Sequence, residues 1–212
     1  MADGQAVETV VFDLGGVLID WNPRYLYRTM FDDPAVMEHF LTEVATGHWN
    51  EKFDAGRTMD EGIAELLAVH PHLEVPLKAW KDRWIEMIKG PIPGTVTILE
   101  ELAANGTHLV ALTNWSIETF PLVHKDEAGY PFFRHFDNVY VSGELKLIKP
   151  DPRIFAHVEQ DLGKSGDRLL FIDDNAANIA AAEARGWRAH RFTDADSLRA
   201  CLEKLDLLDR AA

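Results

Sequence analysis

Five short stretches with strand character recur along the chain, and the first of them, Thr9–Phe12, is wholly apolar apart from its threonine and rich in β-branched residues. An unbroken apolar run of this length is typical of a strand that is covered on both faces. Such strands are usually parallel, since parallel sheets carry helices on both sides. The predicted strands are Thr9–Phe12, His108–Leu112, Asn138–Val141, Leu169–Ile172 and Arg188–Phe192.

Helical patterns separate these strands. The predicted helices are Val96–Ala104, Pro152–Leu162 and Ala176–Arg185. Gly106 and Gly186 follow two of them, at the position where a glycine commonly ends a helix. Strands that alternate with helices predict an α/β fold, with a doubly wound, Rossmann-like parallel sheet.

The stretch between Pro23 and Lys89 interrupts this rhythm, because it has helical segments and no convincing strand. Thr58 and Glu61 have the spacing of a capping box ahead of an apolar helical segment. We therefore expect residues 21–90 to form a small helical cap, inserted after the first strand into a core made of residues 1–20 and 91–212. The two junctions, near residues 20–23 and 90–94, are predicted hinges.

Composition limits the partners of this protein. The 212 residues are 47% apolar, which suits a globular fold, and 35 acidic against 21 basic residues leave a net charge of −14. Such a chain repels nucleic acid and anionic membranes, so we expect neither as a partner. Met1–Val7 does not resemble a signal peptide and no apolar run is long enough for a membrane span, so we expect a cytoplasmic protein, monomeric or homodimeric. Cys201 is the only cysteine, which excludes an internal disulfide.

Acidic residues end two of the predicted strands. Asp13 follows the first and precedes Gly15 and Gly16, which leave room for a ligand to approach the backbone. Asp173 and Asp174 end another. Adjacent carboxylates repel each other, and a hard cation such as Mg²⁺ relieves that repulsion. Asp13 alone could equally be an ordinary helix cap. The Asp173-Asp174 pair could also cap a helix, but a cap needs only one acid, so we favour a metal there.

Two further segments offer groups that bind phosphate. Thr113 ends a predicted strand and supplies a hydroxyl, and Asn114 adds a backbone N–H. Lys149 precedes Pro150, which disfavours helix and keeps the lysine in a loop. Taken singly, the pair Thr113-Asn114 is also common turn chemistry, and a lone lysine is usually a solvated surface residue.

In this order the four segments resemble the motifs of the haloacid dehalogenase superfamily, in its branch with a helical cap (subfamily IA). The resemblance runs from Val10 to about Arg191. Its details look most like small bacterial sugar-phosphate phosphatases and the phosphatase domain fused to some epoxide hydrolases. It implies a Mg²⁺-dependent phosphoric monoester hydrolase that acts on a small phosphorylated metabolite, and a sugar phosphate is the substrate we expect.

The resemblance also implies roles for individual residues. Asp13 is the nucleophile that forms an aspartyl-phosphate, with Thr113 and Lys149 as further catalytic residues. Asp13, the Gly15 carbonyl, Asp173 and Asp174 are the expected metal ligands. The residues expected to contact substrate are Gly16, Asn114, Trp49 and Trp115.

One position departs from the family pattern. Most phosphatases of this superfamily carry a second Asp two residues after the nucleophile, as general acid and base, and here that residue is Gly15. Losing such help costs about 10²–10⁴-fold in rate. Asp20 is a candidate substitute, although it could equally cap the first helix of the cap.

Three alternatives remain open. A 2-haloacid dehalogenase would use Asp13 without metal, but the Asp173-Asp174 pair is unusual for that class. A catalytically attenuated protein that only binds a phosphorylated ligand would explain Gly15, but it would not need a nucleophile. A phosphomutase would normally require the missing Asp.

Overall fold

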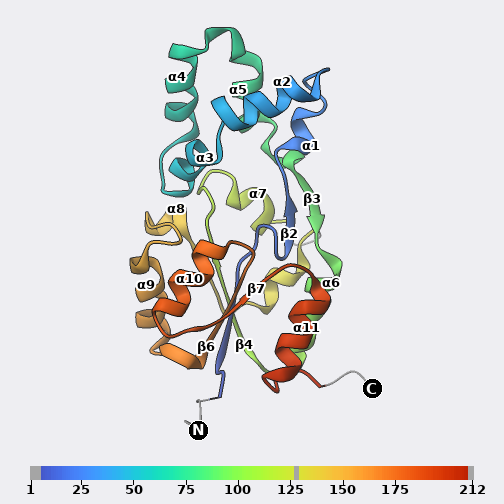
Figure 1. Cartoon of the computed structure of the whole chain (residues 1–212), viewed down its shortest axis with the longest axis vertical. Helices are drawn as coiled ribbons and strands as arrows, with labels where there is room; N and C mark the ends of the chain where they lie inside the picture. Colours follow the sequence, from blue (N-terminus) through green and yellow to red (C-terminus); the bar gives the residue numbers. More distant parts are fainter. Residues whose placement is uncertain (1–5, 127–128, 210–212) are drawn as a thin grey trace.

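The computed structural model describes residues 6–126 and 129–209. Most of the stretch Met1–Val7 and the outermost residues of the predicted core lie outside the described residues. Figure 1 shows an elongated molecule, with a layered α/β core at one end and a group of helices at the other.

The core is built on a five-stranded parallel sheet in the order β5-β4-β1-β6-β7. β1 lies at its centre and pairs in parallel with β4 and β6, so that Val11 lies between Val110 and Phe171. The predicted α/β fold is thereby confirmed. The strands are β1 Thr9–Phe12, β4 His108–Thr113, β5 Asn138–Val141, β6 Leu169–Asp173 and β7 Arg188–Arg191.

Helices cover both faces of this sheet. Alternate residues of β1 face opposite sides, so Val11 packs with α9 and α10 while Val10 and Phe12 pack with α6 and α11. In Figure 1 these two pairs of helices flank the sheet. The helices of the core are α6 Pro93–Ala104, α7 Phe120–His124, α8 Ser142–Leu145, α9 Pro152–Leu162, α10 Ala176–Ala184 and α11 Ala195–Lys204, with short 3₁₀ turns at Pro131–His135 and Gly166–Arg168.

Two short strands join the core to the cap. β2 (Ile19–Trp21) and β3 (Ile88–Pro91) pair antiparallel at the places where we predicted hinges. We expected no strand between Pro23 and Lys89. This is wrong for the last two residues of that stretch, because β3 begins at Ile88. Pairing satisfies the backbone groups of both crossing segments, so the cap is attached by a ribbon rather than by two free linkers.

The cap itself is helical, as predicted. Thr58 and Glu61 form the expected capping box at the start of α4. Its interior is aromatic: Trp80 lies with its ring centroid 6.0 Å from that of Tyr27 and 5.2 Å from that of Trp49. The helical segments are α1 Arg24–Tyr27, α2 Pro34–His39, a π-helical turn Phe40–Val44, α3 Gly47–Asp54, α4 Met59–Val69, α5 Glu74–Asp82, and 3₁₀ turns Pro71–Leu73 and Trp84–Met87.

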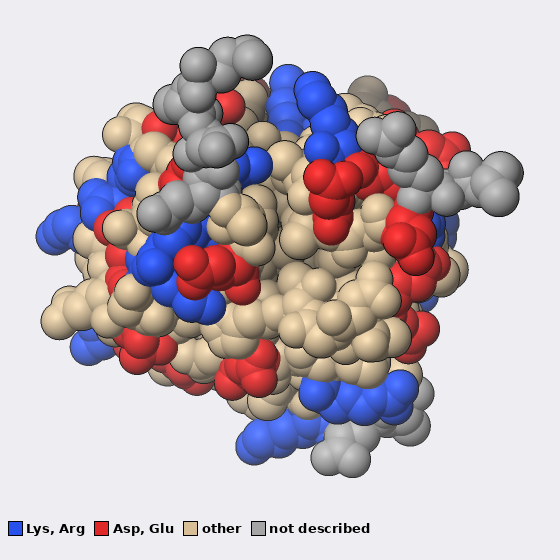
Figure 2. All heavy atoms as spheres, turned by 90° about the horizontal axis from the view of Figure 1, so that it is seen from below, with Lys and Arg blue, Asp and Glu red and all other residues tan. Residues whose placement is uncertain are grey.

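None of the helices in the described part of the chain has the length and apolar character that crossing a membrane requires. Figure 2 shows the end of the molecule opposite the cap, where acidic and basic side chains are interspersed and no basic patch gathers.

Candidate active site

A pocket of about 390 Å³ lies between the carboxyl edge of the sheet and the cap. Parallel strands place the residues that follow them at one edge, which is where open α/β sheets bind ligands. Segments from all four predicted motifs reach this pocket. Its predicted lining residues are Asp13, Gly15, Gly16, Thr113, Asn114, Trp115, Lys149 and Asp174.

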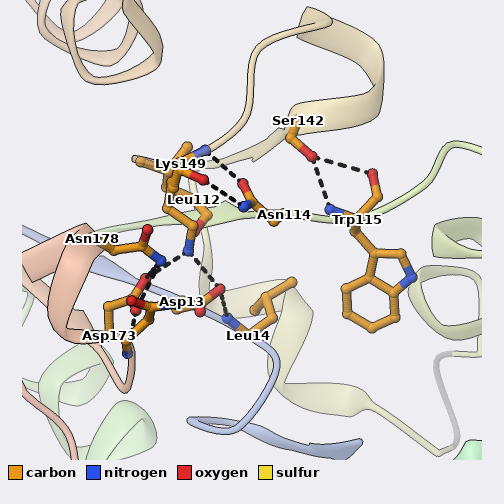
Figure 3. Close-up of polar contacts among 10 residues, drawn as sticks. Asp13, Leu14, Leu112, Asn114, Trp115, Ser142, Lys149, Asp173 and Asn178 are labelled. Atoms are coloured by element: carbon orange, nitrogen blue, oxygen red, sulfur yellow. Dashed lines mark hydrogen bonds and ion pairs between the residues drawn. The ribbon is translucent and has the colours of Figure 1, made fainter. Parts of the chain in front are cut away.

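Lys149 is a buried charged residue and not the solvated lysine that its loop position allows. It is only 3% exposed, and its Nζ lies 2.9 Å from Oδ1 of Asp13 and 2.7 Å from Oδ2 of Asp173 (Figure 3). Nζ also donates to the carbonyl oxygen of Leu112 at 2.9 Å. Burial lowers the pKa of this lysine, but the two carboxylates raise it by more, so the ammonium stays charged.

Asp13 leaves β1 and faces this ammonium. Its Oδ1 accepts both the Lys149 contact and a hydrogen bond from the backbone N–H of Leu14 at 2.8 Å. Burial raises the pKa of the Asp13 carboxyl, and the positive charge of Lys149 opposes that rise. Both contacts fall on Oδ1, so the second oxygen of this carboxylate is used by neither.

Asp174 stands beside Gly16. A Cβ placed on Gly16 would lie 2.6 Å from Oδ2 of Asp174, so only glycine leaves room for this carboxylate. Gly16 also has φ of +74°, which a glycine adopts without strain. Burial and the neighbouring Asp173 raise the pKa of Asp174. One oxygen from each of Asp13, Asp173 and Asp174 lies within 4.8 Å of the others, an all-oxygen group of the kind that hard cations prefer.

Asp173 differs from its neighbour, because its side chain is fully buried and already engaged. Oδ2 contacts Lys149, and the Asn178 amide donates to both oxygens at 3.0 and 3.1 Å. The backbone N–H of Asn175 donates to Oδ1 at 2.8 Å. These contacts hold Asp173 beneath the pocket, where it fixes the position of Lys149.

Thr113 and Asn114 end β4 beside β1. Thr113 is 1% exposed and lines the pocket. The Asn114 amide donates to the carbonyl of Lys149 at 2.9 Å, and its oxygen accepts the Lys149 N–H at 2.8 Å. The side chain of Asn114 therefore holds the loop that carries Lys149, as Figure 3 shows. This leaves the backbone N–H of Asn114 for the predicted contact with substrate.

Aromatic side chains form the cap-facing wall of the pocket. Trp115 lines it, as predicted, with its ring centroid 5.6 Å from that of Trp84, and Trp21 at the ribbon completes the wall. Trp84 was not among the residues that we expected to contact substrate. Trp49, which we expected to contact substrate, is not among the residues that line the pocket: its ring packs on Phe53, and its Nε1–H donates to the Gly62 carbonyl at 3.2 Å, inside the cap.

The pocket also contains residues that the sequence did not reveal. Most of them carry polar or flexible side chains outside the four motifs, so no pattern singled them out. Asn175 directly follows Asp173 and Asp174 but was given no role, and the acid among them ends α3. These residues are Asn50, Asp54, Met59, Ser116, Thr119, Asn175 and Asn178.

Comparison with protein families identifies the class. The model of the haloacid dehalogenase-like hydrolases matches residues 7–186. The chain belongs to this family, and it is a hydrolase built on that fold.

The relatives with assigned activities include phosphatases and dehalogenases. The chain is 26% identical to the sesquiterpene phosphatase astK of Aspergillus oryzae, over 95% of this chain and 96% of the relative. It is 28% identical to (S)-2-haloacid dehalogenase 4A of Burkholderia cepacia, over 66% of this chain and 59% of that one. A solved structure of a wild-type family member from Bacteroides thetaiotaomicron, in complex with magnesium and inorganic phosphate, has a TM-score of 0.67 at 21% identity and covers 89% of this chain and 95% of its own.

Proposed function

We propose that this protein is a magnesium-dependent phosphatase, which hydrolyses a small phosphorylated metabolite through an aspartyl-phosphate on Asp13. The observation that carries it is the ammonium of Lys149, held 2.9 Å from Asp13 at the floor of a pocket that Asp174 also lines. An anionic nucleophile approaches an anionic phosphate only where fixed positive charge offsets their repulsion. Lys149 supplies part of that charge.

Asp13 attacks through Oδ2, the oxygen that neither Lys149 nor Leu14 engages. The attack forms the aspartyl-phosphate and releases the alcohol, and water then hydrolyses the acyl phosphate. Lys149 and the Leu14 N–H restrain the side chain, so little freedom is lost when substrate binds. The Thr113 hydroxyl and the Asn114 backbone N–H bind oxygens of the transferring phosphoryl group.

The acidic cluster fits Mg²⁺ by its donor chemistry. Asp13 and Asp174 present carboxylate oxygens toward one pocket that Gly15 also lines, and like charges this close are costly without a cation. We assign Asp13, Asp174 and the Gly15 carbonyl as direct ligands. Asp173 is occupied by Lys149 and Asn178, so it acts on the site by holding them. When bound, Mg²⁺ supplies positive charge beside the phosphate.

The lining of the pocket indicates the kind of alcohol that leaves. Among the described residues that line it, Lys149 is the one cationic side chain, and it lies on the core side. A substrate with a second anionic group would meet no counter-charge at the wall made by Trp21, Trp84 and Trp115. We infer a phosphate monoester of a neutral alcohol that has an apolar face. A sugar ring has such a face, and so does the hydrocarbon substrate in the name of the Aspergillus relative.

An assay of phosphate release tests this function. Purified protein is given sugar phosphates and p-nitrophenyl phosphate, with Mg²⁺ and with a chelator, and in parallel 2-chloropropionate without metal. Release of phosphate that requires Mg²⁺ supports the phosphatase. Release of chloride from 2-chloropropionate without metal would instead make the protein a dehalogenase, like its Burkholderia relative. A cytoplasmic location is part of the same proposal.

A further inference from the structure

Asp54 is the one acid on the cap side of the pocket among the described residues. It is the last residue of α3, it is 8% exposed, and it lines the same pocket as Asp13. Its side chain accepts a hydrogen bond from the Asn50 amide at 3.0 Å. The hydroxyl of Ser142 donates to the Asp54 carbonyl at 2.6 Å, which fixes this end of the helix against the core.

We propose, on the basis of the phosphatase function proposed above, that Asp54 is the general acid and base of the reaction. The cap would thus supply the group that most phosphatases of the family carry at the position of Gly15. In the first step the Oδ2–phosphorus bond to Asp13 forms, the bond from phosphorus to the leaving oxygen breaks, and that oxygen takes the proton of Asp54. In the second step the Asp54 carboxylate takes a proton from water, whose oxygen attacks phosphorus. The bond between phosphorus and Asp13 then breaks and free phosphate leaves. Asp54 keeps the proton from water and is ready for the next cycle.

Elimination among the titratable groups supports this role. The described residues that line the pocket include four such side chains, on Asp13, Asp54, Lys149 and Asp174. Asp13 is the nucleophile and Asp174 is assigned to the metal. Lys149 donates to three acceptors and stays charged between two carboxylates, so it does not exchange a proton easily.

Asp20, the substitute that the sequence suggested, lies elsewhere. It accepts the hydroxyl of Tyr25 at 2.8 Å and is not part of the pocket lining. It does not cap the first helix of the cap either, because the Arg24 N–H is taken by the Asn22 side chain. Neither of the two roles considered for Asp20 is therefore met.

The surroundings of Asp54 favour a protonated carboxyl near neutral pH. Burial raises its pKa to about 7, with a smaller contribution from Glu51, while Lys149 and the Ser116 N–H oppose the rise. The carboxyl also ends a helix, where the macrodipole disfavours negative charge. A group that carries a proton at neutral pH can give it to a leaving alkoxide, and the carboxylate that remains can take one from water.

Two substrates of similar size separate this role from a structural one. Benzyl phosphate has a poor alkoxide leaving group that needs a proton, whereas p-nitrophenolate leaves without one. We expect Asp54→Asn to lower kcat/KM for benzyl phosphate by about 10²-fold or more and to change kcat/KM for p-nitrophenyl phosphate by less than about threefold. Asp60→Asn makes the same substitution at an exposed acid in the cap and should change neither value.

Equal losses with the two substrates, or no loss with either, would overturn the role of Asp54. The wild-type protein gives a second test that needs no variant. The ratio of kcat/KM for benzyl phosphate to that for p-nitrophenyl phosphate should fall about tenfold per pH unit above about pH 7, where both esters are dianions. The ionisation of the nucleophile affects both values and cancels in the ratio. A flat ratio would overturn the proposal, whereas a wild-type protein that hydrolyses neither ester would overturn the phosphatase function itself.

Discussion

A Cβ built on Gly16 would lie 2.6 Å from Oδ2 of Asp174, closer than real Cβ contacts allow. We therefore expect Gly16→Ala to displace Asp174 and to weaken Mg²⁺ binding by about 10- to 100-fold, as loss of a supporting neighbour typically does. Isothermal titration with Mg²⁺ measures the affinity directly.

Gly106→Ala is the matched control for Gly16. The two glycines have nearly the same φ, +76° and +74°, but a Cβ on Gly106 would meet no atom within 4 Å. Both variants should lose about 1 kcal/mol of stability from the strained backbone. Mg²⁺ affinity should fall only in Gly16→Ala, and unchanged affinity there would exclude Asp174 as a ligand in this position.

Lys149→Met should damage both folding and activity. The change leaves Asp13 and Asp173 buried side by side without their counter-charge, and breaking a buried ion pair costs about 3–5 kcal/mol. Denaturant unfolding should show that loss. In Lys78→Met, which removes an exposed pair with Glu74, denaturant unfolding should show a much smaller loss, because exposed pairs contribute little to stability. Similar losses in both variants would mean that Lys149 is not held as described.

Asp54 should make stability depend on pH. Its folded pKa is raised to about 7, so between pH 4 and 7 the folded protein keeps a proton that the unfolded chain gives up. The wild type should therefore lose stability relative to Asp54→Asn as pH rises, by up to about 1.4 kcal/mol per pH unit, with no further change above pH 7. Urea unfolding of both proteins across this range measures the difference. A difference that grows with pH in favour of the wild type would contradict the buried, protonated carboxyl.

Trp84 and Trp49 should respond differently to the same substitution. Trp84 lines the pocket, whereas Trp49 packs only inside the cap. Trp84→Leu should raise KM for benzyl phosphate by about tenfold, because an aromatic contact of about 1–2 kcal/mol is lost. Trp49→Leu should lower the melting temperature with little change in KM. A KM that rises only in Trp49→Leu would restore the original sequence-based assignment.

Local patterns account for most of the fold prediction. α9 begins and ends where its pattern does, at Pro152 and Leu162, because a proline and a following glycine mark its two ends. α6 begins three residues earlier than predicted, since Pro93 occupies the first turn of a helix as readily as it breaks one. The β2–β3 ribbon was missed because two short segments far apart in sequence become strands only when they meet.

The site was predictable where it depends on strand ends. Asp13 and Asp174 follow strands, and Thr113 ends one, and the order of these strands along the sheet brings the three residues to one pocket. Residues on the cap were not predictable in this way. Whether Trp49 or Trp84 faces the core depends on how helices pack and how the cap sits on the sheet, and neither follows from local spacing. Asp54 was missed for the same reason, because its position beside the core depends on how the cap packs.

The most direct test of the account is to identify the residue that carries the phosphoryl group during turnover. Wild-type protein and Asp13→Asn are mixed with p-nitrophenyl phosphate and Mg²⁺, quenched in acid within one turnover, and digested for mass spectrometry. We predict one added phosphoryl group on the wild-type peptide that contains Asp13, and neither modification nor turnover in the variant. Phosphate on another residue, or an Asp13→Asn protein that turns over at the wild-type rate, would contradict the assignment of Asp13 as the nucleophile.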